Sequence, residues 1–379
     1  MRRFEWTAAL AAAAMVLLAG CGGQLAGGGG GTSSAPIVVD LIGTFSGQNA
    51  DLGSWAWNGV KLAIDGANAK GGVNGRKITL QKYDDQGQPT VGTDLAQRAI
   101  SDRATMVYGS DLSTVSLAMI PTLTSAKIPQ ITSGQAPAIL AQGSSFIFLD
   151  STTSAVFDQT LADYLVQKQH ITSIAMVSNN DAYGKGEHDS FLAELTKLAV
   201  TPTVDKVVTP DQKDFTSVLT EVRATNPKAL FIGAEEVETG LIAKQARSLG
   251  ITATFTGGAP MGTPTYLQTA GADVAEGTIM TSPYLDNDAN AKTRAFAAAY
   301  RKAYGQDPEL HGAKAYDGMN VFIAAMRKAQ PDLGGQRLVD AVRAIEYDGL
   351  LGHFKYDERG LGLHATQIGT IKAGKVTPI

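Results

Sequence analysis

Cysteine and the usual enzyme motifs are what this sequence most clearly lacks. It has one cysteine, Cys21, in 379 residues, so no disulfide can form within the chain. Its five histidines are scattered, and no two have the spacing of a local metal site. The motifs G-x-S-x-G, H-E-x-x-H, Walker A and a G-x-G-x-x-G following a strand do not occur. We therefore expect no enzyme, no metal site and no cofactor.

Charge excess and long apolar runs are also scarce. Lysine and arginine number 32 against 36 acidic residues, which gives a net charge of −4 and a pI near 5.8. Nucleic-acid binding needs a basic surface, and this balance predicts no such partner. No apolar run after the first twenty residues approaches eighteen, so we expect no later segment to enter a membrane.

The N-terminus reads as a targeting segment. Arg2 and Arg3 precede an apolar run over residues 7–20, which is too short to span a bilayer comfortably. The run ends in Leu-Ala-Gly-Cys, with the only cysteine last, and this matches the lipobox of bacterial lipoproteins. A plain secretory signal with a chance cysteine is the alternative. The position of Cys21 favours lipidation, and two acyl chains anchor a protein far better than one.

Residues 22–34 are rich in glycine and serine and predict a flexible tether. Five consecutive glycines at 27–31 lack the preceding strand and the following GK[ST] of a phosphate loop, so we assign them to the tether.

The remaining 345 or so residues alternate strands and helices and are long enough for two cores. Residues 37–43 predict a strand and residues 49–69 a helix, capped by Asn49 or Asp51 and ended by the Gly- and Asn-rich turn 70–75. Residues 76–83 predict the next strand. Later strands are expected at 105–109, 128–132, 145–149, 171–177, 204–208, 229–233, 252–256 and 278–281, and a closing pair at 352–356 and 365–371. Helices between them include 88–98, 113–126, 152–168, 184–198, 215–224, 239–249, 289–304, 311–329 and 338–345. This alternation of strands and helices predicts two doubly wound α/β lobes.

Residues 46–85 also carry a family resemblance. The Ser-Gly turn, the helix ending in Asn-Ala-Lys-Gly-Gly and the strand ending in Tyr-Asp-Asp resemble the first βαβ unit of the leucine/isoleucine/valine-binding proteins, the receptors of bacterial ABC importers. The similarity extends at a lower level over residues 37–369. It implies the type I periplasmic binding protein fold, with two α/β lobes joined by a three-strand hinge and a ligand cleft between them.

The resemblance and the N-terminal pattern together give a domain plan. Residues 1–20 form a signal peptide, and residues 21–35 the lipidated cysteine and tether. Residues 36–154 and 283–354 form lobe 1, and residues 155–282 and 355–379 form lobe 2.

Candidate ligand contacts follow from the strand-to-helix loops, because ligands of doubly wound sheets lie beyond the carboxyl ends of the strands. Ser113 begins a helix and is expected to bind the carboxylate of a ligand; capping of its own helix is the alternative. The resemblance implies backbone contacts at Gly134 and Gln135, and places Ala136 where the family has a threonine. It also implies that Tyr183 reaches into the cleft, whereas a core tyrosine is the alternative.

A second departure concerns the ammonium group of the ligand. The family binds this group with a glutamate that aligns here with Ala259. Glu235 lies one strand earlier, and its carboxylate is a candidate replacement. The alternative is that Glu235 and Glu236 are two exposed acids at a helix start. Leu52 and His311 align with residues around the ligand's side chain, and Trp55 is a possible third wall. Glu187, His188 and Asp189 are expected on a solvated helix surface.

These features predict an extracytoplasmic lipoprotein, anchored to the bacterial cell membrane, that acts as a monomeric receptor for a small polar ligand and delivers it to an ABC permease. The ligand is expected to be an amino acid or a related amide or organic acid. A sensor that signals through a membrane partner is the alternative function. An enzyme on this scaffold is disfavoured, because the sequence offers no nucleophile motif.

The lipid anchor can be tested directly. Cys21→Ser removes the thiol that would carry the diacylglycerol, so the variant should leave the membrane fraction while its ligand affinity stays the same. Fractionation followed by immunoblotting checks this. A variant that stays in the membrane fraction would show that another feature attaches the protein.

Overall fold

The computed structural model describes residues 35–285, 291–362 and 366–379. The signal segment, Cys21 and most of the tether therefore lie outside the described residues. The strands are β1 (Ile37–Gly43), β2 (Ile78–Asp84), β3 (Met106–Gly109), β4 (Gln130–Thr132), β5 (Ile147–Leu149), β6 (Ile174–Asn179), β7 (Val204–Val208), β8 (Ala229–Gly233), β9 (Thr254–Gly257), β10 (Ile279–Ser282), β11 (Glu346–Gly349), β12 (Gly352–Lys355), β13 (Gln367–Lys372) and β14 (Lys375–Pro378).

The α-helices are α1 (Ala50–Ala69), α2 (Pro89–Ser101), α3 (Ser113–Ser125), α4 (Ala138–Ala141), α5 (Ser154–Asp163), α6 (Ala182–Lys197), α7 (Thr216–Thr225), α8 (Glu236–Ser248), α9 (Pro264–Ala270), α10 (Ala272–Ala275), α11 (Ala291–Tyr304), α12 (Leu310–Ala329) and α13 (Gly335–Arg343). A π-helical turn, η1 (Tyr164–Lys168), follows α5, and a 3-10 turn, η2 (Ala259–Gly262), follows β9.

The first sheet has the strand order β2-β1-β3-β4-β5, and all its strands are parallel. Its central strands are buried on both faces, which explains the nearly continuous apolar run of β1. Helices α1, α12 and α13 cover one face, and α2 and α3 cover the other. We call this sheet with its helices the first lobe.

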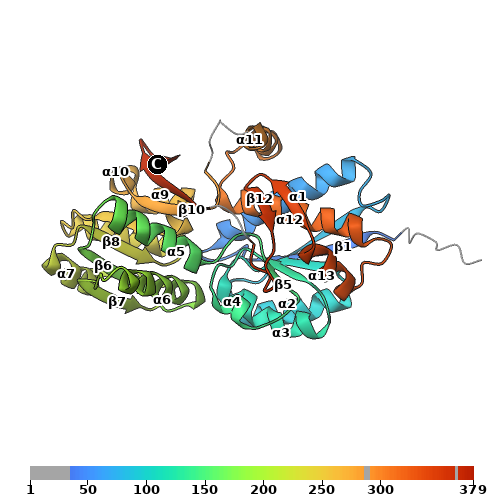
Figure 1. The fold of residues 1–379 in the computed structure, drawn as a ribbon, viewed down its shortest axis with the longest axis horizontal. Coiled ribbons are helices and arrows are strands. Elements are labelled where there is room, and N and C mark those ends of the chain that lie inside the picture. The colour runs from blue at the N-terminus through green and yellow to red at the C-terminus, as the bar shows by residue number, and fades with distance from the viewer. Residues whose placement is uncertain (1–34, 286–290, 363–365) are drawn as a thin grey trace, which may run out of the picture. The chain divides into compact units, whose positions relative to one another are not determined.

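The second sheet repeats the same arrangement. Its parallel part has the order β7-β6-β8-β9-β10, which is the order of the first sheet, and β13 and β14 extend it as antiparallel strands. Helices α5 and α6 pack on one face, while α7, α8 and α9 pack on the other. This is the second lobe, and its yellow and green elements stand apart from the blue β1 and α1 in Figure 1.

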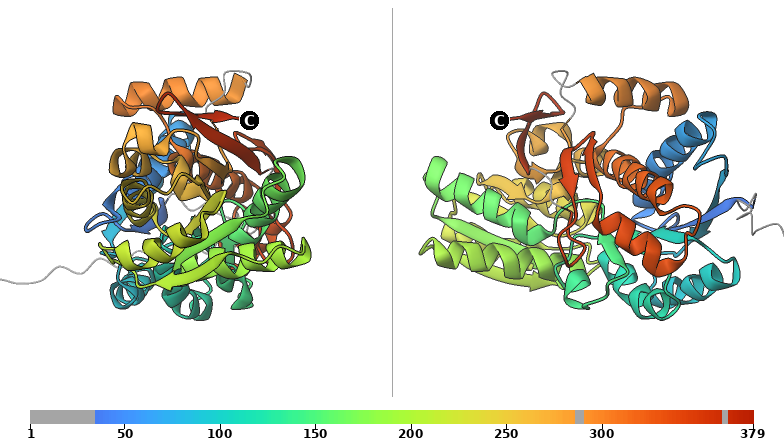
Figure 2. Two further views of the ribbon diagram at one scale, coloured as in Figure 1. Left: turned by 90° about the vertical axis from the view of Figure 1, so that its left-hand side faces the viewer. Right: turned by 45° about the vertical axis from the view of Figure 1, so that its right-hand side comes forward.

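The chain passes between the lobes three times. It enters the second lobe after β5 and returns after β10, so that α12 packs beside α1 although the two lie far apart in sequence. After the β11–β12 hairpin, Tyr356 and Leu361 still contact the first lobe, and then β13 joins the second sheet. Figure 2 shows the red strands of the C-terminus beside the second sheet. The predicted fold, two doubly wound α/β lobes, is confirmed.

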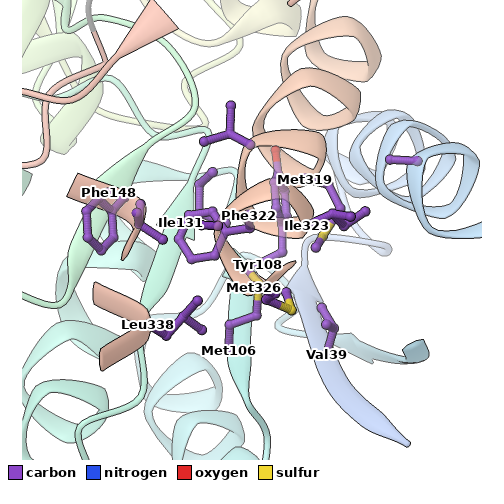
Figure 3. Close-up of a cluster of buried hydrophobic side chains, with 14 of the residues drawn as sticks. Val39, Met106, Tyr108, Ile131, Phe148, Met319, Phe322, Ile323, Met326 and Leu338 are labelled. Carbon is purple, nitrogen blue, oxygen red and sulfur yellow. The ribbon is translucent and has the colours of Figure 1, made fainter. Parts of the chain in front are cut away.

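The returning helix α12 fills the core of the first lobe. Figure 3 shows its apolar side chains against those of the strands and of α13; the labelled residues are Met319, Phe322, Ile323, Met326, Val39, Met106, Tyr108, Ile131, Phe148 and Leu338. Since α12 also carries His311 at its start, this packing fixes one wall of the space between the lobes.

The closing strands predicted at 352–356 and 365–371 are present as β12 and β13, although residue 365 itself lies outside the described residues; β12 pairs with β11, and β13 pairs with β10 and β14. One local prediction was wrong. Asn49 occupies the N-cap position of α1, but its side chain makes no capping bond, and Asp51 instead accepts a hydrogen bond from Thr265 of the second lobe. The turn after α1 is confirmed, because Gly71, Gly72 and Asn74 all have positive φ. Within the described ranges, we find no helix long and apolar enough to cross a membrane.

The contact between α1 and α12 can be tested with two glycines of the same helix. A Cβ added at Gly59 would lie 2.2 Å from the backbone oxygen of Gly312 on α12, whereas a Cβ at Gly66 would meet nothing within 4 Å. Gly59→Ala should therefore lower the free energy of unfolding by about 1–3 kcal/mol. Gly66→Ala should raise it by up to about 1 kcal/mol through helix propensity. Denaturant melts check both, and equal effects would contradict the close packing.

Candidate ligand-binding site

A small cavity lies where the two sheets direct their loops toward each other. In sheets of this strand order the ligand site is the point where the order reverses, which here is between β1 and β3 and between β6 and β8. Loops and helix starts after these four strands supply most of the lining. The lining residues are Leu52, Asp111, Ser113, Ser133, Gln135, Tyr183, Glu235, Glu236, Pro260 and His311, and the cavity volume is about 20 Å³.

The structure brings together six of the eight residues proposed from sequence to contact the ligand. These are Leu52, Ser113, Gln135, Tyr183, Glu235 and His311. Gly134 and Ala136 are buried behind the lining, and their amides are engaged: the Gly134 amide donates to Thr132 Oγ1 at 2.9 Å and the Ala136 amide to Ser113 Oγ at 3.2 Å. The binding roles of all eight residues stay predictions.

Ser113 does not cap its own helix. Leu112 occupies the N-cap position of α3, and no side chain caps this helix. The hydroxyl oxygen of Ser113 instead accepts hydrogen bonds from the amides of Gln135 and Ala136, each at 3.2 Å. Its hydroxyl proton is then free to point toward an acceptor in the cavity.

His311 joins the two lobes across the cavity. Its ring stacks on Trp55 at 5.6 Å between centroids, and its Nδ1 lies 3.0 Å from Glu309 Oε2. Its Nε2 lies 3.6 Å from Oε1 of Glu236, which begins α8 in the second lobe. A second contact between the lobes is the amide of Ala182, which donates to Thr114 Oγ1 at 3.2 Å.

Glu235 and Glu236 are not the exposed pair that the alternative interpretation expected. They are 9% and 3% exposed, because the start of α8 faces the first lobe. Burial raises the pKa of both carboxyl groups; nearby Asp181 raises that of Glu235 further, and His311 lowers that of Glu236. Glu235 holds the N-cap position of α8 but makes no capping bond, so its carboxyl group is available to the cavity.

Asp111 lines the cavity and was missed from sequence. It is 8% exposed, and neither carboxylate oxygen has a hydrogen-bond partner among the described residues. Burial raises its pKa well above the usual range, and the charges of Asp85 and Asp150 add to this, while Lys314 opposes it. Its position in the loop that also carries Ser113 was the available signal.

Glu187 was assigned to a solvated surface, and that assignment was wrong. His188 and Asp189 do face outward. The two ring nitrogens of His188 form hydrogen bonds with the carboxylates of Asp189 and Asp205, each at 2.9 Å. Glu187 is fully buried one helical turn after Tyr183, so the two side chains share a face of α6. A Cβ added at Gly258 would lie 2.6 Å from Glu187 Oε2 and 2.7 Å from the Tyr183 hydroxyl. Burial raises the pKa of Glu187 to about 8, and the neighbouring Tyr183 hydroxyl acts in the opposite direction.

Lys314 brings a positive charge near the lining. It is fully buried, its ammonium group donates to the backbone oxygen of Ser133 at 3.2 Å, and Asp150 Oδ1 lies 3.9 Å away. In the part of the chain that the structure describes, no three His, Cys, Asp or Glu side chains are placed to hold a metal ion. The site is thus a small polar cavity lined mainly by acids, one hydroxyl and one imidazole.

Comparisons with known proteins identify the family and agree with the fold. The model of the family described as periplasmic binding protein matches residues 36–375. A Leu/Ile/Val-binding protein of Rhizobium johnstonii is 29% identical over 90% of this chain and 93% of its own length. The crystal structure of a leucine-binding protein from Thermotoga maritima is similar with a TM-score of 0.85, 23% identity, and coverage of 90% of this chain and 97% of that one. The structure of a solute-binding protein from R. palustris in complex with benzoate is similar with a TM-score of 0.84 and 21% identity. The match covers 91% of this chain and 95% of that one.

The buried acid on α6 predicts a pH dependence of stability. The pKa of Glu187 rises from 4.5 to about 8 on folding, so between these values the folded state holds a proton that the unfolded state has lost. The free energy of unfolding should therefore fall as pH rises from about 5 to 8, with a slope of at most about 1.4 kcal/mol per pH unit for this proton. Glu187→Gln should flatten this slope, and Glu346→Gln, at an exposed acid on β11, should not. Urea melts across this range check it; equal slopes in all three proteins would contradict the burial of an ionisable Glu187.

Proposed function

Since this chain belongs to the family of periplasmic binding proteins, we propose that it is the extracytoplasmic substrate-binding component of an ABC importer, anchored through a lipid on Cys21. The relatives are named as binding proteins, and we propose binding without catalysis for this chain as well. Its partners would be a small polar ligand and a permease in the membrane.

The observation that carries this proposal is the cavity at the switch points of both sheets. Ser113 of the first lobe and Glu235 of the second both line it, so a ligand that touches both would hold the lobes together. The Ser113 hydroxyl would donate to a ligand oxygen. Glu235 would accept from an ammonium group, because a charge-assisted hydrogen bond is strong in a desolvated site.

Ligand entry requires the lobes to separate. A volume of about 20 Å³ holds roughly one water molecule, which is far less than any amino acid occupies. The three passages of the chain between the lobes are the natural place for a hinge, and hinge closure around a ligand is a common device in binding proteins. The permease would then recognise the closed form.

The ligand class follows from the acceptor and donor groups in the cavity. Relatives are named for leucine, isoleucine and valine, and one was solved with benzoate. In this chain Ala259, where the resemblance implies a glutamate, is buried in η2 and brings no charge. We propose that Glu235 supplies the missing carboxylate, and that the ligand is an amino acid or a related amide or organic acid.

A thermal-shift screen of the purified mature protein tests the proposed function. Amino acids, amides and organic acids, benzoate included, are added singly. At 100 times its Kd a ligand should add about 2.7 kcal/mol to the stability of the folded state. A clear rise in Tm with at least one small polar compound supports the proposal, and no rise with any would contradict it.

Glu235→Gln tests the assigned counter-charge. If Glu235 binds an ammonium group, the affinity for the amino acid that gives the largest Tm shift should fall by about 2–5 kcal/mol, as for one partner of a desolvated pair. Glu346→Gln makes the same charge change at an exposed position and should leave affinity unchanged. Calorimetry measures both. Tight amino-acid binding that survives Glu235→Gln would show that another group holds the ammonium.

A further inference from the structure

The carboxyl groups around the cavity fall into two sets. The first set consists of acids that have protein partners. Asp150 accepts hydrogen bonds from Tyr108 and Ser133, at 2.6 and 2.5 Å. Glu309 accepts from His311 Nδ1 and from the amides at the start of α12.

Other nearby acids are also engaged. Asp85 accepts from Thr44 and Ser110, Asp181 caps α6 at the Gly184 amide, and Glu238 accepts from Asn179. These groups have structural roles; among their oxygens only Asp150 Oδ1 lacks a hydrogen bond within the described residues, and Lys314 Nζ lies 3.9 Å from it.

The second set is buried without such partners. Both oxygens of Asp111 and the Oε2 of Glu236 have no hydrogen-bond partner among the described residues. Asp111 and Glu236 line the cavity from opposite lobes, and Glu187 lies directly behind Tyr183. A buried carboxylate without a partner is costly, so such groups mark a place where a donor or a positive charge is missing.

Among the described residues, Lys314 and His311 are the basic groups that lie near these acids; Lys314 lowers the pKa of Asp111 and of Glu236, but neither basic group donates a hydrogen bond to them. Lys314 faces Asp150 and the Ser133 carbonyl, and His311 faces Glu309 at 3.0 Å and Glu236 only at 3.6 Å. Asp111 on one wall, together with Glu235 and Glu236 on the other, therefore leaves the cavity with an excess of acidic groups from both lobes.

We propose that the cavity binds a compound of net positive charge, with one cationic nitrogen group against Glu235 and Glu236 and a second N–H-bearing group against Asp111. This inference rests on the proposed binding function and narrows its ligand to small organic cations, such as a basic amino acid, a diamine or a guanidine. A zwitterion would satisfy only one wall, and an anion would meet carboxyl groups on both.

Binding of a cation should also change the number of protons bound to the protein. Burial favours the protonated carboxyl groups when no cation is near, with a pKa of about 8 for Glu187 and raised pKa values for Asp111, Glu235 and Glu236. The charged groups that face them are Lys314, His311 and Glu309 at α12, Asp85 and Asp150 of the first lobe, and Asp158, Asp181 and Glu238 of the second. An entering cation favours the ionised carboxylates, so binding releases protons and affinity rises with pH toward 8.

Matched pairs of compounds test the proposal. Arginine and citrulline, lysine and norleucine, and putrescine and 4-aminobutanoate are nearly equal in size within each pair but differ in charge. In thermal-shift measurements on the mature protein, the more positive member of at least one pair should raise Tm by several degrees, and its partner should raise it less. Stabilisation by leucine or benzoate without any by the cations would overturn this inference and leave the proposed function standing. No stabilisation by any of these compounds or by the screen would contradict both.

Asp111→Asn provides a second test of the proposal. The probe is the cation that raises the Tm of the wild-type protein most in the paired measurements. The substitution removes a buried carboxylate without changing size, so the free variant should melt at the same or a higher temperature than wild type. Its affinity for arginine, lysine or putrescine should fall at least about tenfold. Calorimetry in phosphate and in Tris should show fewer protons released than from wild type, whereas Glu346→Gln should behave as wild type in both respects. Unchanged affinity and unchanged proton release in Asp111→Asn would overturn the role of Asp111.

Discussion

The structure depends on one topological constraint, which is that both lobes use the same strand order. In each sheet the order reverses at one point, and a crevice forms there beyond the carboxyl ends of the strands. With those crevices opposed, the starts of α3, α6 and α8 and the first turns of α1 and α12 all meet in one small space. Ser113 and Glu235 stand at helix starts but make no capping bonds there, so their polar groups face the shared space. The site is thus a consequence of the fold, and its chemistry is decided by a few residues per loop.

Burial then changes what those residues can do. On an open surface Asp111, Glu235 and Glu236 would be ordinary hydrated carboxylates; between closed lobes they lose water and compete for protons. A closed empty cavity and a closed cavity with a counter-charge therefore differ in free energy. This difference offers a physical reason for closure to depend on the ligand, since only a complementary compound offsets the cost of bringing the acids together.

Much of the fold followed from the sequence. Strand-helix alternation gave the two lobes, and the glycine-rich turn after α1 was located correctly because Gly and Asn tolerate positive φ. The return of α12 to the first lobe was accessible only through the family resemblance, since its apolar residues could cover either sheet. For the site, loop position after a strand pointed to Ser113, and the family resemblance pointed to Tyr183 and Glu235. Neither signal indicated Asp111 or Glu187, because charged side chains are expected at the surface; Glu187 is instead buried within its own lobe, beside Gly233 and Gly258.

The most direct test of the account is a crystal structure of the mature protein grown with the compound that raises its Tm most. The account predicts electron density for that compound between the two sheets, with an oxygen or nitrogen within hydrogen-bond distance of Ser113 or Asp111 on one side and of Glu235 or Glu236 on the other. Density for the compound in any other place, or between the sheets without contact to the second lobe, would contradict it.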